Sequence, residues 1–595
     1  MATATALPRW DLTPFFPSIE SPEFHEAFAS FGRDIGRLEA IVAEHRLGRD
    51  APLDRALFDQ VIGLLNAVLE QRTLFQAYLS AHTTTDATDV VAQAKESELD
   101  GLHTRFQKVR ARLTAWIGSI DEKALLGSTP RARDHSYFIE KCQVGARHQM
   151  SPAEEELAAE LQPIAGAAWE KLYGNVSSLI QTTVPLPEGD RVLPMSAIRN
   201  LAYEADRRIR QVAFETELAT WKANEVPLAA ALNSIKGQVG TLNRRRGWES
   251  PLDEALFQAN IDRATLDAML GAARDAFPDF RRYLKAKARA LGVGRLAFFD
   301  LFAPVGDSAR QWPYEEAERF VEMNFATFSD KLADSARRAF RERWIDAEAR
   351  TGKRDGAYCA PYPKGISRVM MNFRPSFGSV KTLAHELGHA YHNLCLGERT
   401  AIQQDIPMTL AETASIFCET IMKRAALKAM PEGERITLLE ASLQSECQVV
   451  VDITSRFIFE SGVFEGRIER ELSAAELCGL MRNAQLDTYG DALDPERLHP
   501  YMWAAKPHYY ASEESFYNFP YMFGLLFGLG LYGLYEAEPA GFHERYDELL
   551  STSGMADAAT LAASVGIDIR SKAFWARGLA TIRDEIDQFE VLVGR

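Results

Sequence analysis

The sequence predicts a mainly α-helical protein with one small β-sheet. Long segments place apolar residues at helical intervals with few glycine or proline breaks. Strand-like runs are confined to two short regions, and no repeat or long low-complexity linker interrupts the chain. The 595 residues, 46% hydrophobic and 25% charged, have the composition of a globular protein that can bury a large core.

The helical pattern is clearest in five segments, namely 53–81, 87–116, 152–172, 196–224 and 313–349. Residues 522–534 form the most apolar stretch, which is too short to span a bilayer and is therefore predicted to be a buried helix. The turn-rich segment 185–194 predicts a small hairpin. The other strand signals lie at 357–373.

His385-Glu386-Leu387-Gly388-His389 is the most informative stretch of the chain. Residues four apart project from one face of a helix, so His385 and His389 can offer two imidazoles to one Zn²⁺. Glu386 is rotated by about 100° from His385, which places it to hold a water beside the metal and not to bind the ion. Its carboxylate can take a proton from that water and pass it to a leaving amine.

The surrounding residues favour a buried helix. Leu383, Leu387, Ala390 and Leu394 recur at helical spacing and form an apolar face. Gly388 costs stability inside a helix, so a residue without a side chain between the two histidines makes sense if something must pass close to the helix.

A catalytic zinc site keeps one position open, so a third protein ligand is expected nearby. The segment 405–419 is the best source, because Pro407 suits the first turn of a helix. Glu412 and Glu419 are seven residues apart and share one face, about 10 Å from each other. One of them can bind the metal and the other can accept the second N–H of a ligand histidine.

The motif followed by Glu412 and Glu419 resembles the thimet oligopeptidase family of zinc metallopeptidases, and within it the oligoendopeptidase F branch. Residues 352–359 and 367–373 resemble the turn and short strand before the zinc helix of that family. Residues 506–510 and 516–521 resemble its His- and Tyr-rich segment.

The resemblance implies a two-lobed helical body around a deep channel, with the small sheet beside the zinc-binding helix. We expect an N-terminal helical region over residues 1–195, as part of a lobe or lid, and a catalytic domain over residues 196–595. The implied site residues are His385, His389 and Glu412 for one Zn²⁺ per chain, Glu386 as general base, and Glu419 as the partner of a ligand histidine.

Water attack on an amide creates a charged oxygen that needs donors besides the metal. We predict His508, Tyr517 and Tyr521 as catalytic residues and Tyr510 as a substrate contact. The spacing from His508 to Tyr517 is longer than the family pattern and Pro520 interrupts the aromatic run, so which side chain stabilises the oxyanion stays open.

The strand at 367–373 is predicted to pair with an extended peptide through its backbone, with Met371 and Asn372 as substrate contacts. Short unfolded peptides are the expected partners. The net charge of −16 disfavours nucleic acid. The six cysteines form no C-x-x-C pair and read as reduced thiols. Residues 1–11 show no secretory pattern, so a cytoplasmic location without membrane attachment is expected.

These features predict a zinc-dependent oligoendopeptidase. A zinc aminopeptidase or carboxypeptidase would carry the same motif, and a non-catalytic peptide-binding protein is a third possibility. The intact Glu386 argues against the last, because a binding protein has no need of a general base. The sequence does not indicate the oligomeric state or the cleavage preference.

Overall fold

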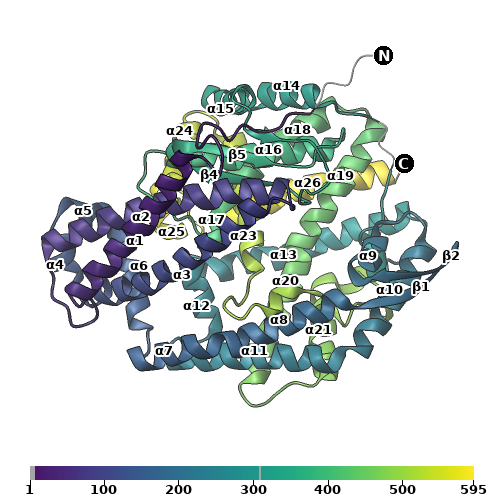
Figure 1. The fold of residues 1–595 in the computed structure, drawn as a ribbon. Helices are drawn as coiled ribbons and strands as arrows, with labels where there is room; N and C mark the ends of the chain where they lie inside the picture. Colours follow the sequence, from purple (N-terminus) through teal and green to yellow (C-terminus); the bar gives the residue numbers. More distant parts are fainter. Residues whose placement is uncertain (1–6, 307–309, 595) are drawn as a thin grey trace. The chain divides into compact units, whose positions relative to one another are not determined.

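The computed structural model describes residues 7–306 and 310–594 (Figure 1). The prediction of a mainly helical protein is confirmed, and the described strands form one two-stranded and one three-stranded sheet. The chain divides into two compact units. Unit 1 comprises Met1–His148, Arg310–Ala426 and Leu534–Ile567, and unit 2 comprises Gln149–Ala309, Leu427–Gly533 and Asp568–Arg595. The predicted division at residue 195 stays a prediction.

Unit 1 begins with a helical bundle that has an aromatic core. Helices α1, α2 and α3 pack against one another, and α6 packs on α3 (Figure 1). Phe24, Phe28, Phe75 and Tyr78 meet in this core with ring centroids 5.1 to 5.8 Å apart, which stabilises the bundle beyond simple burial. The helices are α1 (Pro22–Glu44), α2 (Arg55–Thr85), α3 (Val90–Ser119), α4 (Glu122–Leu126), α5 (Pro130–Asp134) and α6 (Ser136–Arg147).

The rest of unit 1 holds the three-stranded sheet. Its central strand β5 (Ile366–Met370) pairs antiparallel with β4 (Tyr358–Tyr362) and parallel with β3 (Ile345–Asp346). Helix α16 (Phe377–Leu396) packs against β4 and β5, which confirms a small sheet beside the H-E-x-x-H helix. The other helices are α14 (Tyr314–Phe325), α15 (Asp330–Arg341), α17 (Met408–Ala411), most of α18 (Thr413–Ala429), α24 (Phe542–Ser551) and α25 (Ala558–Ser564).

Unit 2 contains the hairpin and most of the long C-terminal helices. The hairpin joins β1 (Gln181–Leu186) to β2 (Gly189–Pro194), as predicted. Helix α13 packs along α26, and α20 packs against α21 and α11. The helices are α7 (Pro152–Leu161), α8 (Gly166–Leu179), α9 (Met195–Asn200), α10 (Arg207–Ala223), α11 (Glu225–Arg245), α12 (Pro251–Gln258), α13 (Arg263–Ala290), α19 (Glu432–Cys447), α20 (Ile453–Arg467), α21 (Ala474–Tyr489), α22 (Met502–Ala505), most of α23 (Phe519–Ala537) and α26 (Lys572–Val593).

Three predicted helical segments are interrupted. The predicted segment 152–172 is divided at Pro163, because proline has no N–H for the helix interior. Pro163 lies in a 3-10 turn between α7 and α8. Asp206 starts α10 by accepting the N–H of Arg208, which divides 196–224. Ser329 caps α15 in the same way, and the end of 313–349 forms β3 instead of helix.

The apolar stretch 522–534 lies in α23, where Met522, Phe523 and Leu526 are fully buried, so the predicted buried helix is confirmed. Within residues 7–306 and 310–594, each helix is too short or too polar to cross a bilayer. Residues 1–6 of the stretch without a secretory pattern lie outside the described part.

Candidate active site

Helix α16 presents the H-E-x-x-H residues on a rigid element. Ser376 caps its start by accepting the N–H of Ser379. Leu383, Leu387 and Ala390 are buried on the apolar face, as predicted, whereas Leu394 is partly exposed. His385 and His389 are four residues apart and therefore project together.

Gly388 lets a second helix approach α16 between the two histidines. A Cβ atom at this position would lie 2.6 Å from the carbonyl oxygen of Ala414 and 2.7 Å from the Cα of Ser415. The predicted reason for this glycine is confirmed, since the start of α18 passes directly against it. This approach places Glu412, which ends α17 next to α18, beside the histidines.

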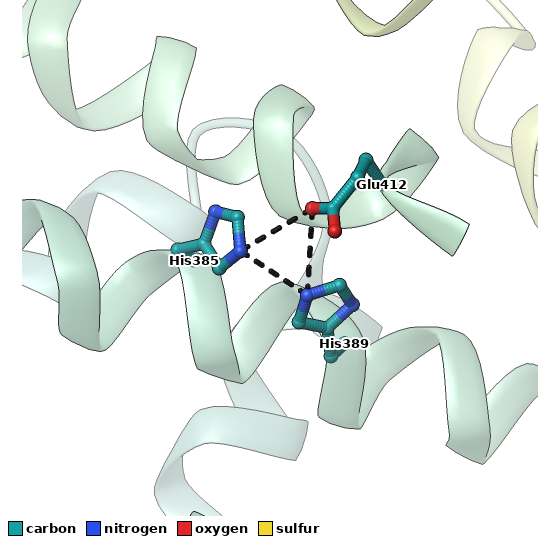
Figure 2. A group of neighbouring side chains, drawn as sticks. All are labelled: His385, His389 and Glu412. Carbon is teal, nitrogen blue, oxygen red and sulfur yellow. Dashed lines mark hydrogen bonds and ion pairs between the residues drawn. The ribbon is translucent and has the colours of Figure 1, made fainter. Parts of the chain in front are cut away.

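His385, His389 and Glu412 converge on one point (Figure 2). The Nε2 atoms of the two histidines are 3.1 Å apart. The Oε2 atom of Glu412 lies 3.3 Å from His385 Nε2 and 3.5 Å from His389 Nε2. The spacing of Glu412 and Glu419 left open which of the two carboxylates lies beside the histidines. In the structure it is Glu412.

The hydrogen bonds of both histidines leave their Nε2 atoms as electron-pair donors. His385 Nδ1 donates to Glu419 Oε1 at 3.0 Å, and His389 donates to the backbone carbonyl of Ala411. Because His389 Nε2 faces His385, the donating atom of His389 is Nδ1. Two nitrogen lone pairs and a carboxylate oxygen therefore meet at one point, where they repel one another unless a cation or a proton lies between them.

The three atoms have the spacing of one face of a zinc tetrahedron. Ligand bonds of about 2.0–2.1 Å place neighbouring tetrahedral ligands about 3.3–3.4 Å apart. The observed separations of 3.1, 3.3 and 3.5 Å bracket that value. Two imidazoles and one carboxylate are also the donor set of catalytic zinc sites with an open fourth position. The residues present therefore fit Zn²⁺.

Charges around His385 set the protonation of the metal-free site. Burial acts to lower the pKa of His385, but its bond to Glu419 and the charges of Glu419 and Glu412 raise it to about 9. Burial, aided by the nearby His385 and opposed by Glu412, lowers the pKa of His389 to about 4. The proton on His385 relieves the repulsion in the metal-free protein, and an incoming cation must displace it.

Two residues that the sequence analysis missed hold the carboxylates in place. Lys381 Nζ lies 3.2 Å from Glu419 Oε2. Burial acts to raise the pKa of Glu419, but Lys381 and His385 lower it to about 2, so this carboxylate stays ionised. The buried hydroxyl of Ser415 lies 2.7 Å from Glu412 Oε2. Lys381 is one turn before His385, and Ser415 is three residues after Glu412, so helical spacing was the available signal.

Glu386 is held without a partner for one of its oxygens. Its side chain is 5% exposed, and in the described part of the chain Oε2 has no hydrogen-bond partner. Burial raises the pKa of Glu386 to about 7, although the charge of His385 opposes the shift. A buried carboxylate with one unpaired oxygen, next to a metal-ligand histidine, is suited to exchange a proton with a water or a substrate.

In unit 2, His508, Tyr517 and Tyr521 form a cluster. The rings of His508 and Tyr517 stack with centroids 4.7 Å apart at 26°, and those of Tyr517 and Tyr521 are 6.0 Å apart. All three side chains are partly exposed. Pro520 lies in the first turn of α23, where its missing N–H costs nothing, so it does not break up the cluster.

The predicted substrate contacts Tyr510, Met371 and Asn372 differ in how far they are buried. Tyr510 is fully buried and stacks on Tyr173 at 3.7 Å, a placement that does not support substrate contact. Met371 is also buried, and its N–H donates to the backbone carbonyl of Asp346. Asn372 is partly exposed, and its amide donates to the carbonyls of Arg354 and Gly356.

The prediction that the strand at 367–373 pairs with an extended peptide stays a prediction, although much of this strand is already paired within the sheet. Strand β5 is the central strand, and it pairs with β4 over Ile366–Met370 but with β3 only at Val369 and Met370. A peptide can add only to a free edge. Substrate contact at Asn372, beyond the end of β5, stays a prediction.

Comparison with known proteins decides the family. The model of peptidase family M3 matches residues 200–581, and the oligopeptidase F model matches residues 119–181. The chain belongs to peptidase family M3. It is an M3 metallopeptidase and a homologue of oligopeptidase F, and the metal-ligand group formed by His385, His389 and Glu412 is its candidate metal site.

The relatives of this M3 peptidase are distant in sequence. Oligopeptidase PepF of Bacillus subtilis is 23% identical, with 98% of this chain and 87% of the relative covered. Group B oligopeptidase PepB of Streptococcus agalactiae is 25% identical over 76% of each chain. The fold matches a crystal structure from Chlamydophila abortus with a TM-score of 0.85 at 20% identity over 98% of both chains. It also matches oligoendopeptidase-F of Enterococcus faecium with a TM-score of 0.69 at 18% identity, covering 96% and 99%.

Proposed function

We propose that this M3 peptidase is a zinc-dependent oligoendopeptidase that hydrolyses internal bonds of short, unfolded peptides. The observation that carries the proposal is the convergence of His385, His389 and Glu412 at the spacing of a zinc tetrahedron, with an unpaired carboxylate oxygen of Glu386 on the helix of the two histidines. The names of its oligoendopeptidase relatives support internal cleavage.

His385, His389 and Glu412 would hold the ion, which when bound supplies Lewis acidity and lowers the pKa of water towards about 7. Glu386 takes the proton of the attacking water and transfers it to the amine nitrogen as the peptide C–N bond breaks. Glu419 holds His385 in the tautomer that presents Nε2. Water and peptide are consumed, and a carboxylate and an amine are released.

We assign His508, Tyr517 and Tyr521 to contacts with the reacting peptide, and Asn372 to a contact with its backbone. The phenols of Tyr517 and Tyr521 are suitable donors to the oxygen that becomes negatively charged during water attack. The partial exposure of these side chains supports the assignment.

Cleavage of an internally quenched peptide blocked at both ends tests the endopeptidase proposal. We expect internal cuts by mass spectrometry, loss of activity with a chelator, and recovery with Zn²⁺. A zinc-loaded protein that leaves blocked peptides intact but trims free peptides would be an aminopeptidase or a carboxypeptidase. A zinc-loaded protein that cleaves neither would be a binding protein.

Replacement of Glu386 tests the proton transfer. Glu386→Gln should keep the fold and the zinc content but lower kcat by at least about 10²-fold, because an amide cannot carry the proton. Glu398→Gln is the matched control, because Glu398 is exposed just beyond the end of α16. Near-normal turnover by Glu386→Gln with full zinc content would contradict the mechanism.

A further inference from the structure

Helix α20 and the π-helical turn before it carry a buried row of charged residues. Asp452, Arg456 and Glu460 follow at intervals of four, so they lie on one face of the helix. They are 2%, 9% and 2% exposed. Buried charges are stable only when they are paired, so each should have a specific partner.

The partners connect this row to the segment that carries His508 and Tyr517. Arg456 forms an ion pair with Asp452, and its Nη1 donates to Asn518 Oδ1 at 3.0 Å. Glu460 pairs with Lys236 at 2.6 Å and accepts the N–H of Phe516 at 3.1 Å. Phe516 has a φ of 55°, a strained value that such an anchor helps to hold.

Arg456 determines which way the Asn518 amide faces. A guanidinium only donates hydrogen bonds, so the atom of Asn518 that it contacts must be the carbonyl oxygen. The same oxygen lies 2.9 Å from His508 Nδ1. A carbonyl oxygen only accepts, so Nδ1 of His508 must carry the hydrogen, and Nε2 of the neutral ring is left with its lone pair.

We propose that Asp452, Arg456 and Asn518 are positioning residues that hold His508 in its Nδ1–H tautomer, so that Nε2 accepts a hydrogen bond. The inference deepens the proposed function and rests on it in one respect, the identity of the donor. In a peptidase, the group that donates a hydrogen bond to Nε2 is a backbone N–H of the bound peptide. Tyr517 or Tyr521, and not His508, then donates the hydrogen bond to the negatively charged oxygen.

Burial, aided by two neighbouring cations, favours the neutral form of the His508 ring. Burial lowers the pKa of His508, the bond to Asn518 and the charge of Glu460 oppose the shift, and the charges of Arg456 and Lys506 add to it. Near neutral pH, His508 therefore carries no second proton that would turn Nε2 into a donor.

Histidine-selective ¹⁵N labelling and solid-state NMR of the zinc-loaded full chain measure the tautomer directly. The His508 signals are assigned by difference from His508→Asn among the 12 histidines. At neutral pH we expect a protonated Nδ1 and an unprotonated Nε2. An Nε2–H tautomer or an imidazolium in the unmodified protein would overturn the proposal.

Two variants separate positioning from a purely structural role. Asp452→Asn with Arg456→Met removes both members of the buried pair together, so that neither is left without the other, and frees the Asn518 amide to turn. We expect part of His508 to shift to the Nε2–H tautomer and kcat/KM to fall about tenfold, the effect of one lost hydrogen bond. Asn518→Asp should keep the Nδ1–H tautomer and move the pH dependence of His508 upward.

The matched control is Glu460→Gln with Lys236→Met, which removes the other ion pair of the same helix face without touching Asn518. It should leave the tautomer unchanged. An unchanged tautomer in the Asp452/Arg456 variant would overturn the proposal. Because NMR reports on the resting protein, absence of peptidase activity would contradict the proposed function and leave the tautomer result standing.

Discussion

Glu386 is more easily protonated in the folded protein than in the unfolded chain. Burial raises its pKa from 4.5 to about 7 against the opposing charge of His385, with Glu412 and Glu419 adding to the rise. A carboxyl with a raised folded pKa stabilises the fold below its unfolded pKa, and this contribution is lost as the pH rises through about 7.

In the metal-free protein, the stability of the unmodified chain relative to Glu386→Gln should therefore decline between pH 4.5 and pH 8 by up to about 3 kcal/mol. Denaturant unfolding of both proteins with a chelator present measures this difference. The glutamine variant is the more stable of the two at pH 8 because it carries no charge to bury. A difference that does not change with pH would show that Glu386 titrates normally.

Glu419 acts through His385. Replacement by glutamine removes the charge that pairs with Lys381 and weakens the acceptor for His385 Nδ1. We expect zinc affinity to fall by about 10- to 100-fold, as measured by competition with a chromogenic chelator. Equal affinities for Glu419→Gln and the exposed Glu398→Gln would mean that Glu419 does not orient the ligand.

At the scale of secondary structure, the contact between α16 and α18 depends on Gly388. Gly388→Ala would drive a methyl group into the backbone of Ala414 and Ser415, which we expect to cost about 1–3 kcal/mol and to displace Glu412. Gly378→Ala is the control in the same helix, where the added carbon meets only Ser376 Oγ at 3.6 Å. Thermal unfolding and zinc titration of both variants check this. Equal thermal stability and equal zinc affinity of the two variants would contradict the close approach of α18 to α16.

Periodicity located long helices such as α2 and α3, and the H-E-x-x-H spacing located α16. Spacing alone could not choose Glu412 over Glu419, because that choice depends on where α17 ends and how closely α18 approaches Gly388. It could not show that β5 is the central strand, because strand order is set by pairings distant in sequence. The hydrogen bonds from Arg456 and His508 to Asn518 could not be predicted either, because Arg456 is distant in sequence from the other two residues.

At the scale of the whole molecule, the candidate zinc ligands all belong to unit 1. Hydrogen exchange should therefore slow on zinc binding in α16 and in residues 408–419, while α13 and α26 of unit 2 stay unchanged. For local openings that release the ion, zinc should raise the free energy of opening by about 4 kcal/mol when the free zinc concentration is a thousand times Kd. Mass spectrometry with and without a chelator measures it, and a change confined to unit 2 would contradict the assigned site.

Unit 1 is assembled from three separated stretches of chain, which sets an order of events during synthesis. The aromatic core of α1, α2 and α3 is complete early. Phe417, however, packs against Phe542 and Tyr546 of α24, and α16 also packs on α24. At about 5–20 residues per second, on the order of ten seconds passes between the emergence of α16 and of α24 from the ribosome. The side of α16 that packs on α24 therefore stays uncovered for that time, although β4 and β5 already pack on the helix, so the nascent chain exposes part of its metal-ligand helix until α24 emerges.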